Sequence, residues 1–77
     1  MKIVVDSQGR EIGNFDGNLV KDSHGKVIYW ISDEDVFAPN EYADEDLHAF
    51  NKGQFSKIGE YDGGLCTSNN EVIFEIK

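Results

Sequence analysis

The 77-residue chain is short of cysteine, proline and basic residues, and these shortages narrow what it can be. Cys66 is the only cysteine, so no internal disulfide can form and the fold must rest on its hydrophobic core. Seven Lys and Arg residues face fifteen Asp and Glu residues, a net charge of −8. This balance argues against nucleic acid and against an anionic membrane surface as partners, since both present negative charge.

Long hydrophobic runs are also missing. The start of the chain has three consecutive apolar residues, Ile3 to Val5, before Asp6. A signal peptide or a membrane span needs a longer run, so we expect a cytoplasmic protein in a reducing environment. Leu, Ile, Val and Phe nevertheless make up 21 of the 77 residues, above the roughly 20% below which disorder is expected. We therefore expect a single folded domain, residues 1–77.

Internal repeats are the strongest signal in the sequence. Residues 4–12 resemble residues 20–28 at a shift of 16, and both segments contain Asp-Ser-x-Gly. A shift of 46 aligns residues 12–19 with 58–65, and residues 27–31 match 72–76 after a one-residue deletion. These matches define four related units in two pseudo-symmetric halves. The units span about residues 3–16, 18–32, 47–62 and 65–77.

Each unit has the pattern of a β-hairpin, and together they predict an all-β fold. A short first strand (residues 3–5, 19–21, 47–50 or 65–67) is followed by turn-forming residues. In the Asp-Ser-x-Gly turns, Asp hydrogen-bonds its own backbone and Gly takes a positive φ. Further turn signals occur at Asn51-Lys52-Gly53, Asn69-Asn70, Asp16-Gly17 and Asp62-Gly63. No window shows helical periodicity long enough for a major helix.

Alignment of the units places residues of one kind in columns. One column holds only isoleucine: Ile12, Ile28, Ile58 and Ile73. The next alternates glycine with an aromatic residue: Gly13, Tyr29, Gly59 and Phe74. We expect the two aromatic rings to cover the two glycines, because glycine leaves room over bare backbone. A further apolar column lies two residues on, so the strands must be covered on both sides, by each other or by a second copy of the chain. Self-association is therefore expected.

Residues 33–46 interrupt the repeat and are interpreted as an acidic insertion. The segment includes the only proline, Pro39, and Asn40 is suited to cap the start of a short helix. One or two helical turns and a structureless excursion are both compatible with this composition.

The repeated pattern resembles a known family. Four hairpin units with Gly-[Arg/Lys]-x-Ile, the Asp-Gly links, and Trp30 at the end of the second unit are similar to the four-fold β-flower domain family. Its members are small bacterial proteins made of four hairpin repeats. The resemblance covers about residues 3–32 and 47–77. It implies a fold, and it implies neither an established activity nor site residues.

The sequence offers little for catalysis or metal binding. Neither Asp33-Glu34-Asp35 nor Asp44-Glu45-Asp46 is followed by the glycine of an EF-hand loop, although weak calcium binding stays open beside a plain solvated acidic face. Zinc is not expected, because His24, His48 and Cys66 are far apart in the sequence. No spacing pairs Cys66 with either histidine as nucleophile and base. We predict no cofactor, no metal and no enzyme activity.

Charge concentration marks the candidate binding site. Residues 33–46 contain seven acids and no Lys or Arg, so they carry −7 of the net −8. Trp30 aligns with three polar residues, so it is expected to face solvent, or else to pack under the insertion against Phe37 or Tyr42. The candidate partner-binding residues are Asp33, Glu34, Asp35, Glu41, Asp44, Glu45, Asp46 and Trp30.

Two functions fit these features. The first is a non-enzymatic interaction or structural module. The second is an acidic inhibitor or immunity-type protein that binds a basic protein partner through residues 33–46, since an acidic patch steers association with basic surfaces.

Overall fold

The chain folds into a closed antiparallel barrel of four consecutive hairpins, in a computed structural model that describes residues 2–43 and 52–77. Each strand pairs with its neighbours in sequence, and β8 pairs with β1 to close the barrel. No α-helix occurs in the described residues, which contain one 3-10 turn, η1 (Lys52–Gln54). The strands are β1 (Lys2–Asp6), β2 (Glu11–Phe15), β3 (Leu19–Lys21), β4 (Val27–Ser32), β5 (Asp35–Pro39), β6 (Phe55–Asp62), β7 (Leu65–Ser68) and β8 (Glu71–Ile76).

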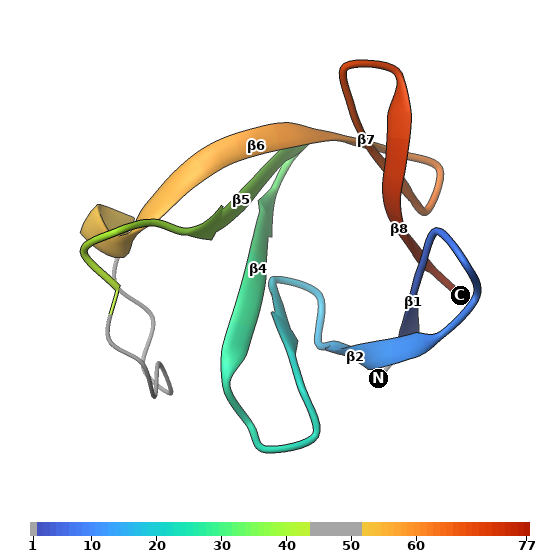
Figure 1. Cartoon of the computed structure of the whole chain (residues 1–77), viewed down its shortest axis with the longest axis horizontal. Coiled ribbons are helices and arrows are strands. Elements are labelled where there is room, and N and C mark those ends of the chain that lie inside the picture. Colours follow the sequence, from blue (N-terminus) through green and yellow to red (C-terminus); the bar gives the residue numbers. More distant parts are fainter. Residues whose placement is uncertain (1, 44–51) are drawn as a thin grey trace.

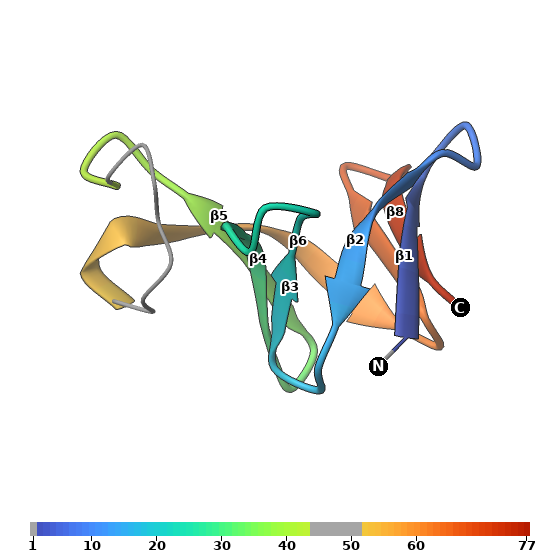
Figure 2. The ribbon, with the colours of Figure 1, turned by 90° about the horizontal axis from the view of Figure 1, so that it is seen from below.

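The four hairpins radiate from a common centre. Viewed down the shortest axis, their tips point in four different directions around the barrel (Figure 1). The β5–β6 hairpin extends well beyond the other three, as the perpendicular view shows (Figure 2). The all-β prediction and the prediction of four hairpins are therefore confirmed.

The isoleucine column marks a β-bulge in every hairpin. Val4 lies opposite Gly13 and Val5 opposite Glu11, so Ile12 is an extra residue in β2. The same register shift leaves an extra isoleucine in β4, β6 and β8, namely Ile28, Ile58 and Ile73. A bulge bends its strand and increases the local twist. Each hairpin therefore bends away from the barrel beyond its isoleucine, while the isoleucine itself packs against the core.

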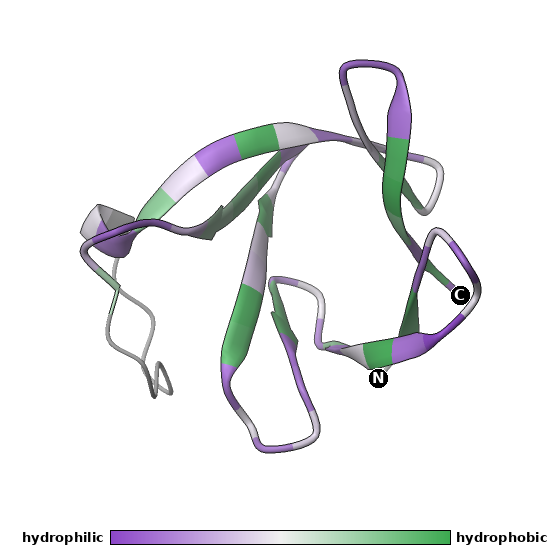
Figure 3. Ribbon diagram, in the orientation of Figure 1, coloured by the Kyte–Doolittle hydropathy of each residue, from purple (hydrophilic) through white to green (hydrophobic). Residues whose placement is uncertain are grey.

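Apolar residues follow the strands near the barrel axis, whereas the tips of the first, second and fourth hairpins are hydrophilic (Figure 3). One residue from the first strand of each hairpin is fully buried: Val4, Val20, Val36 and Cys66. These four are joined by Tyr29 and Phe74, whose ring centroids lie 4.5 Å apart. The closed barrel thus brings the four first-strand residues and the two rings into one core, in which Phe74 is fully buried and Tyr29 partly buried.

The two glycines of the aromatic column permit a close approach of neighbouring backbones. A Cβ at Gly13 would lie 2.3 Å from the carbonyl oxygen of Lys21, and a Cβ at Gly59 would lie 2.3 Å from that of Thr67. The sequence predicted that the rings of Tyr29 and Phe74 would lie over these glycines. This prediction is wrong, because the backbone of the next hairpin fills the space beside each glycine and the two rings pack on each other. The two contacts are related by the 46-residue shift found in the sequence.

The turn residues act as the sequence predicts. Asp6 Oδ1 accepts hydrogen bonds from the backbone N–H groups of Gln8 and Arg10, both at 2.9 Å. Asp22 repeats this with the N–H groups two and four residues on, at 2.9 and 3.0 Å, and Asp16 with those two and three residues on, at 2.9 and 2.8 Å. These backbone N–H donors lower the pKa of each of the three turn aspartates. In each turn the donor farther along the chain has the larger effect.

Two of the tight turns use positive φ at both central positions. Gly63 and Gly64 have φ of 61° and 91°, and Asn69 and Asn70 have φ of 52° and 67°. This is the backbone of a type I′ hairpin turn, which suits the right-handed twist of the strands. Asn tolerates this region better than most residues, so the Asn69-Asn70 turn connects β7 to β8 without glycine.

The boundaries of the third hairpin correct the sequence prediction. Its first strand is β5, within the segment predicted to be an insertion, and β5 pairs with β6 from Asp35–Glu60 to Pro39–Phe55. The extra residues therefore follow β5 in the sequence, between Pro39 and Phe55, so the predicted insertion, residues 33–46, begins too early. The strand predicted at 47–50 lies outside the described residues.

The start of this segment is a turn. The side chain of Asn40 accepts a hydrogen bond from the Tyr42 N–H at 2.9 Å, and its carbonyl accepts one from Ala43 at 3.0 Å. Asn40 N–H donates to the Gln54 carbonyl at 2.8 Å, which joins the two ends of the segment. Asn40 thus caps a turn, and the rest of the predicted helix lies outside the described residues.

Candidate partner-binding surface

The predicted acidic residues separate into three groups in the structure. Asp33 and Glu34 form the exposed two-residue turn between β4 and β5, where Asp33 has a φ of 55°. Asp35 begins β5, and Glu41 is exposed in the turn after Asn40. Asp44, Glu45 and Asp46 lie outside the described residues. The structure therefore places Asp33, Glu34 and Asp35 together where the second hairpin joins the third.

Two further acids join this group. The Glu34 carbonyl accepts a hydrogen bond from the Tyr61 N–H at 2.8 Å, which brings the β4–β5 turn beside the end of β6. Glu60 lies directly opposite Asp35, and Asp62 ends β6 before the turn to β7. We call Asp33, Glu34, Asp35, Glu60 and Asp62 the acidic rim. Glu60 and Asp62 were missed from the sequence, because only the pairing of β5 with β6 brings them beside the other three.

One lysine partly offsets the charge of the rim. Lys57 Nζ lies 3.0 Å from Asp35 Oδ1, and both side chains are about half exposed (50% and 47%). The hydrogen bond from Lys57 to Asp35, and then the charge of Asp35, raise the pKa of the lysine. An exposed pair of this kind contributes little stability. Lys57 also interacts electrostatically with Glu60, so its charge offsets the repulsion between the facing side chains of Asp35 and Glu60.

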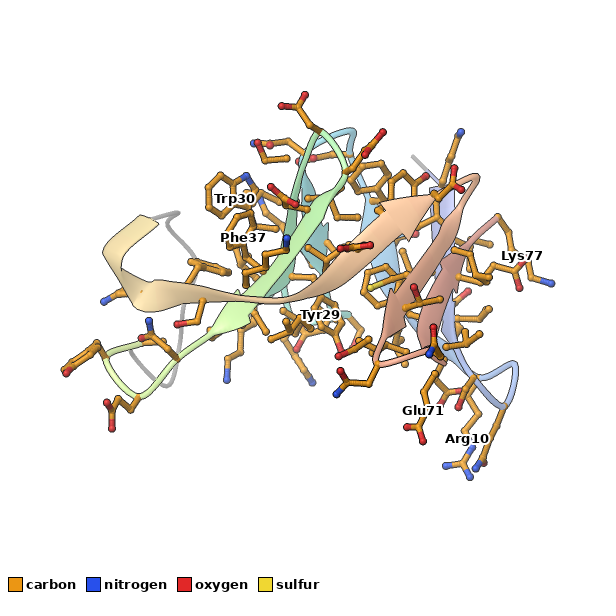
Figure 4. The ribbon with its side chains drawn as sticks, turned by 90° about the horizontal axis from the view of Figure 1, so that it is seen from above. Arg10, Tyr29, Trp30, Phe37, Glu71 and Lys77 are labelled. Carbon is orange, nitrogen blue, oxygen red and sulfur yellow. The ribbon has the colours of Figure 1, made fainter. Side chains whose placement is uncertain are left out.

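Trp30 packs against the third hairpin. Its ring stacks on Phe37 with centroids 4.2 Å apart and meets the edge of Phe55 at 6.2 Å. Figure 4 shows the Trp30 and Phe37 rings side by side. Together with Val27 they form a second apolar cluster outside the barrel core. Of the two positions predicted for Trp30, packing against Phe37 describes the structure, although the ring stays partly exposed.

The residues considered for catalysis lie apart. Cys66 is fully buried, and burial raises the pKa of its thiol to about 11, so it is neither accessible nor a thiolate at neutral pH. His24 lies exposed in the β3–β4 turn, and His48 is outside the described residues. No group of three or more His, Cys, Asp or Glu side chains in the described ranges could hold a metal ion. Within the same ranges, no helix is long and apolar enough to cross a membrane.

Two shallow grooves lie where neighbouring hairpins diverge. The β6–β7 groove has a volume of about 390 Å³ and is lined by residues 57–60 and 67–70. The β2–β3 groove, of about 300 Å³, is lined by residues between Asn14 and Gly25. The 46-residue shift relates four lining residues of each groove: Glu60, Thr67, Ser68 and Asn69 correspond to Asn14, Lys21, Asp22 and Ser23. The grooves were not predicted from the sequence.

Comparison of the chain with protein-family models, curated proteins and solved structures finds no match.

Proposed function

We propose that the chain is a small non-enzymatic interaction module that binds a basic protein partner through the acidic rim. The observation that carries this proposal is the gathering of five acidic residues on β5, β6 and the β4–β5 turn, where Lys57 forms an ion pair with one of them, Asp35. Four hairpins around a common centre also support membership of the four-fold β-flower family.

The barrel suits such a role because it holds the rim rigidly. The β4–β5 turn is held by the Glu34–Tyr61 backbone hydrogen bond and by the pairing of both its strands. A turn whose backbone is fixed before binding loses little entropy when a partner docks. Clustered charge of one sign also raises association rates with an oppositely charged partner, and this effect weakens with salt.

The test compares two charge-neutralised variants. Asp33→Asn with Glu34→Gln removes two charges from the rim, and Glu11→Gln with Glu71→Gln removes two exposed charges from elsewhere on the barrel. Proteins from a bacterial lysate are captured on the immobilised chain at about 50 mM salt and eluted at about 500 mM, where exposed charges are screened. We expect a basic protein to bind the wild type and the control, and to be lost from the rim variant. Equal retention by all three chains would refute the proposal.

A second candidate function is inhibition of that partner. Tyr42 favours it, because this residue, in the turn that follows β5, is 72% exposed. An exposed aromatic residue is a common anchor in protein interfaces. If the chain is an inhibitor, adding it to the captured partner abolishes that partner's activity at equimolar ratio. Unchanged activity of the partner in the complex would exclude inhibition and leave binding as the only proposed function.

A further inference from the structure

We propose that Asp62, at the start of the β6–β7 turn, is a modification site at which the Asp62-Gly63 peptide isomerises spontaneously to isoaspartate. Its counterpart at the 46-residue shift, Asp16-Gly17, is the same dipeptide and is protected by the fold. This inference does not depend on the proposed function, because the reaction takes place within the backbone of the chain itself.

The reaction needs no reagent other than water. The backbone nitrogen of Gly63 attacks Cγ of Asp62, so that an N–Cγ bond forms, a Cγ–O bond breaks, and the carboxyl OH leaves with the amide proton as water. The product is a five-membered succinimide ring. Water then adds to the ring at the backbone carbonyl carbon of Asp62 and breaks the bond between that carbon and the Gly63 nitrogen. The main chain now runs through Cγ, and the former backbone carbonyl is a free carboxyl group.

Both reacting groups are available at Asp62. Among residues 2–43 and 52–77, the Asp62 carboxylate accepts no hydrogen bond and the Gly63 N–H donates none. Both residues are exposed. The space beside Gly63 is also open, since no atom lies within 4 Å of the place where its Cβ would be. Glycine has no side chain to hinder attack by its nitrogen.

The carboxylate of Asp16 is held, although Asp16 is exposed as well. Its Oδ1 accepts hydrogen bonds from the N–H groups of Leu19 at 2.8 Å and Asn18 at 2.9 Å. These bonds restrain the side chain, and the one from Leu19 has the largest effect in lowering the pKa of Asp16. Attack needs the protonated carboxyl group, from which water can leave. The fold therefore opposes the reaction at Asp16, and solvent access does not distinguish the two sites.

The difference arises from one residue in otherwise identical turns, residues 16–19 (Asp-Gly-Asn-Leu) and 62–65 (Asp-Gly-Gly-Leu). Gly64 has a φ of 91°, so the second turn closes as type I′ without using the aspartate side chain. Asn18 does not have a positive φ, and its N–H is bound by the Asp16 carboxylate. The same dipeptide is thus restrained in the first turn and unrestrained in the second.

Attack requires only a local opening of the barrel. Asp62 is the last residue of β6, and its partner in the ladder is Leu65 across the turn. The pairing of β6 with β5 ends earlier, at Glu60. Rotation of Asp62 toward the Gly63 nitrogen therefore disturbs one pair at the end of a ladder, where opening costs least.

Isomerisation would alter the turn. It adds one carbon atom to the main chain of a two-residue turn, whose geometry sets the register of the hairpin. The next pair of the ladder, Tyr61–Cys66, contains a fully buried residue of the core. We therefore expect the isomerised chain to unfold at a lower temperature than the unmodified chain.

The test is ageing of the full folded chain for weeks at neutral pH, followed by digestion with a protease that cleaves before aspartate and not before isoaspartate. Isoaspartate leaves the mass of a peptide unchanged, so it is identified by the missed cleavage and by a changed chromatographic retention. Asp62→Glu is the matched control, because it keeps the charge and its longer side chain would have to form a less favoured six-membered ring. A second sample of the wild type is aged in denaturant, in which no turn restrains either aspartate.

We expect isoaspartate to accumulate at Asp62 in the folded chain and to be absent at this position in Asp62→Glu. Asp16 should react at least about tenfold more slowly than Asp62, because hydrogen bonds to a charged acceptor must first break. In denaturant the two sites should react at similar rates.

Two results would overturn the inference. One is a folded chain in which Asp62 reacts no faster than Asp16. The other is a tenfold difference that persists in denaturant, because the difference would then come from the sequence and not from the fold. The capture experiment uses freshly prepared chain, so its outcome and that of the ageing experiment are independent.

Discussion

The close contact at Gly59 can be tested by adding one methyl group. Gly59→Ala places a Cβ 2.3 Å from the Thr67 carbonyl oxygen, a distance that must be relieved by moving β7 away from β6. Its φ lies outside the left-handed region, so the cost is steric and not conformational. Overpacking of this kind costs about 1–3 kcal/mol. A domain of this size has about 4–12 kcal/mol of stability in total, so the loss is a sizeable fraction.

The assay is thermal unfolding followed by circular dichroism. At about 4–8 °C per kcal/mol for a domain of this size, Gly59→Ala should lower the Tm by about 4–24 °C. Gly13→Ala should have a similar effect, because its Cβ would meet the Lys21 carbonyl at the same 2.3 Å. Glu11→Ala, at an exposed position of β2, is the control and should change stability by less than about 0.5 kcal/mol. A Gly59→Ala protein as stable as this control would refute the assignment of the two glycines to close backbone contacts.

Four further predictions follow from the turns, the acidic segment, the buried thiol and the exposed apolar residues. The lowered pKa of each turn aspartate means that the folded chain binds fewer protons than the unfolded chain near pH 4. The stability that these aspartates contribute is therefore complete above that pH and falls as acid protonates them. Replacing them by Asn, which keeps the acceptor oxygen, should flatten the acid limb of the pH–Tm profile relative to wild type. Neutralising four acids of the segment between β5 and β6 should leave the Tm unchanged or raise it, because repulsion between them is relieved. The same change should weaken capture of the basic partner. A large fall in Tm would show that these acids have a structural role. The four substitutions are Glu41→Gln, Asp44→Asn, Glu45→Gln and Asp46→Asn. Cys66 should resist a thiol reagent in the folded protein and react at once in denaturant, and rapid labelling of the native chain would contradict its burial. The chain should self-associate through exposed apolar residues such as Ile3 (45% exposed) and Val72 (41% exposed). Light scattering should then show a mass above the 8.7 kDa of one chain at high protein concentration, and a strict monomer would refute this prediction.

Much of the fold followed from local chemistry that repeats along the chain. The Asp-Ser-x-Gly turns, the Asn69-Asn70 turn and the Gly63-Gly64 link all lie between strands because their residues satisfy the backbone locally. The sequence showed the isoleucine column, but it did not show that each isoleucine is the extra residue of a β-bulge. A bulge is a property of two paired strands, so a single strand read alone cannot reveal it.

The misplaced third strand has a definite physical reason. Val4, Val20 and Val36 recur every 16 residues, but the long tip of the third hairpin moves Ile58 away from its expected place after Val36. The high charge of residues 33–35 then favoured a loop over a strand. A strand tolerates these acids because Asp33 and Glu34 lie in a turn and Asp35 pairs with Lys57. The candidate site was incomplete for the same reason, since Glu60 and Asp62 join it only once β5 is paired with β6.

The closure of the barrel by β1 and β8 has a consequence for how the chain folds. Every other strand pairing joins neighbours in the sequence, so each hairpin can form from contacts that cost little loop entropy. The β1–β8 ladder, from Val4–Ile76 to Asp6–Phe74, is different because it joins residues almost the whole chain apart. Rates of folding fall as such distant contacts become more important. The β1–β8 ladder is thus expected to form after the hairpins and to set the height of the kinetic barrier to folding. Substitutions in this ladder should therefore slow refolding more than equally destabilising substitutions at a hairpin tip.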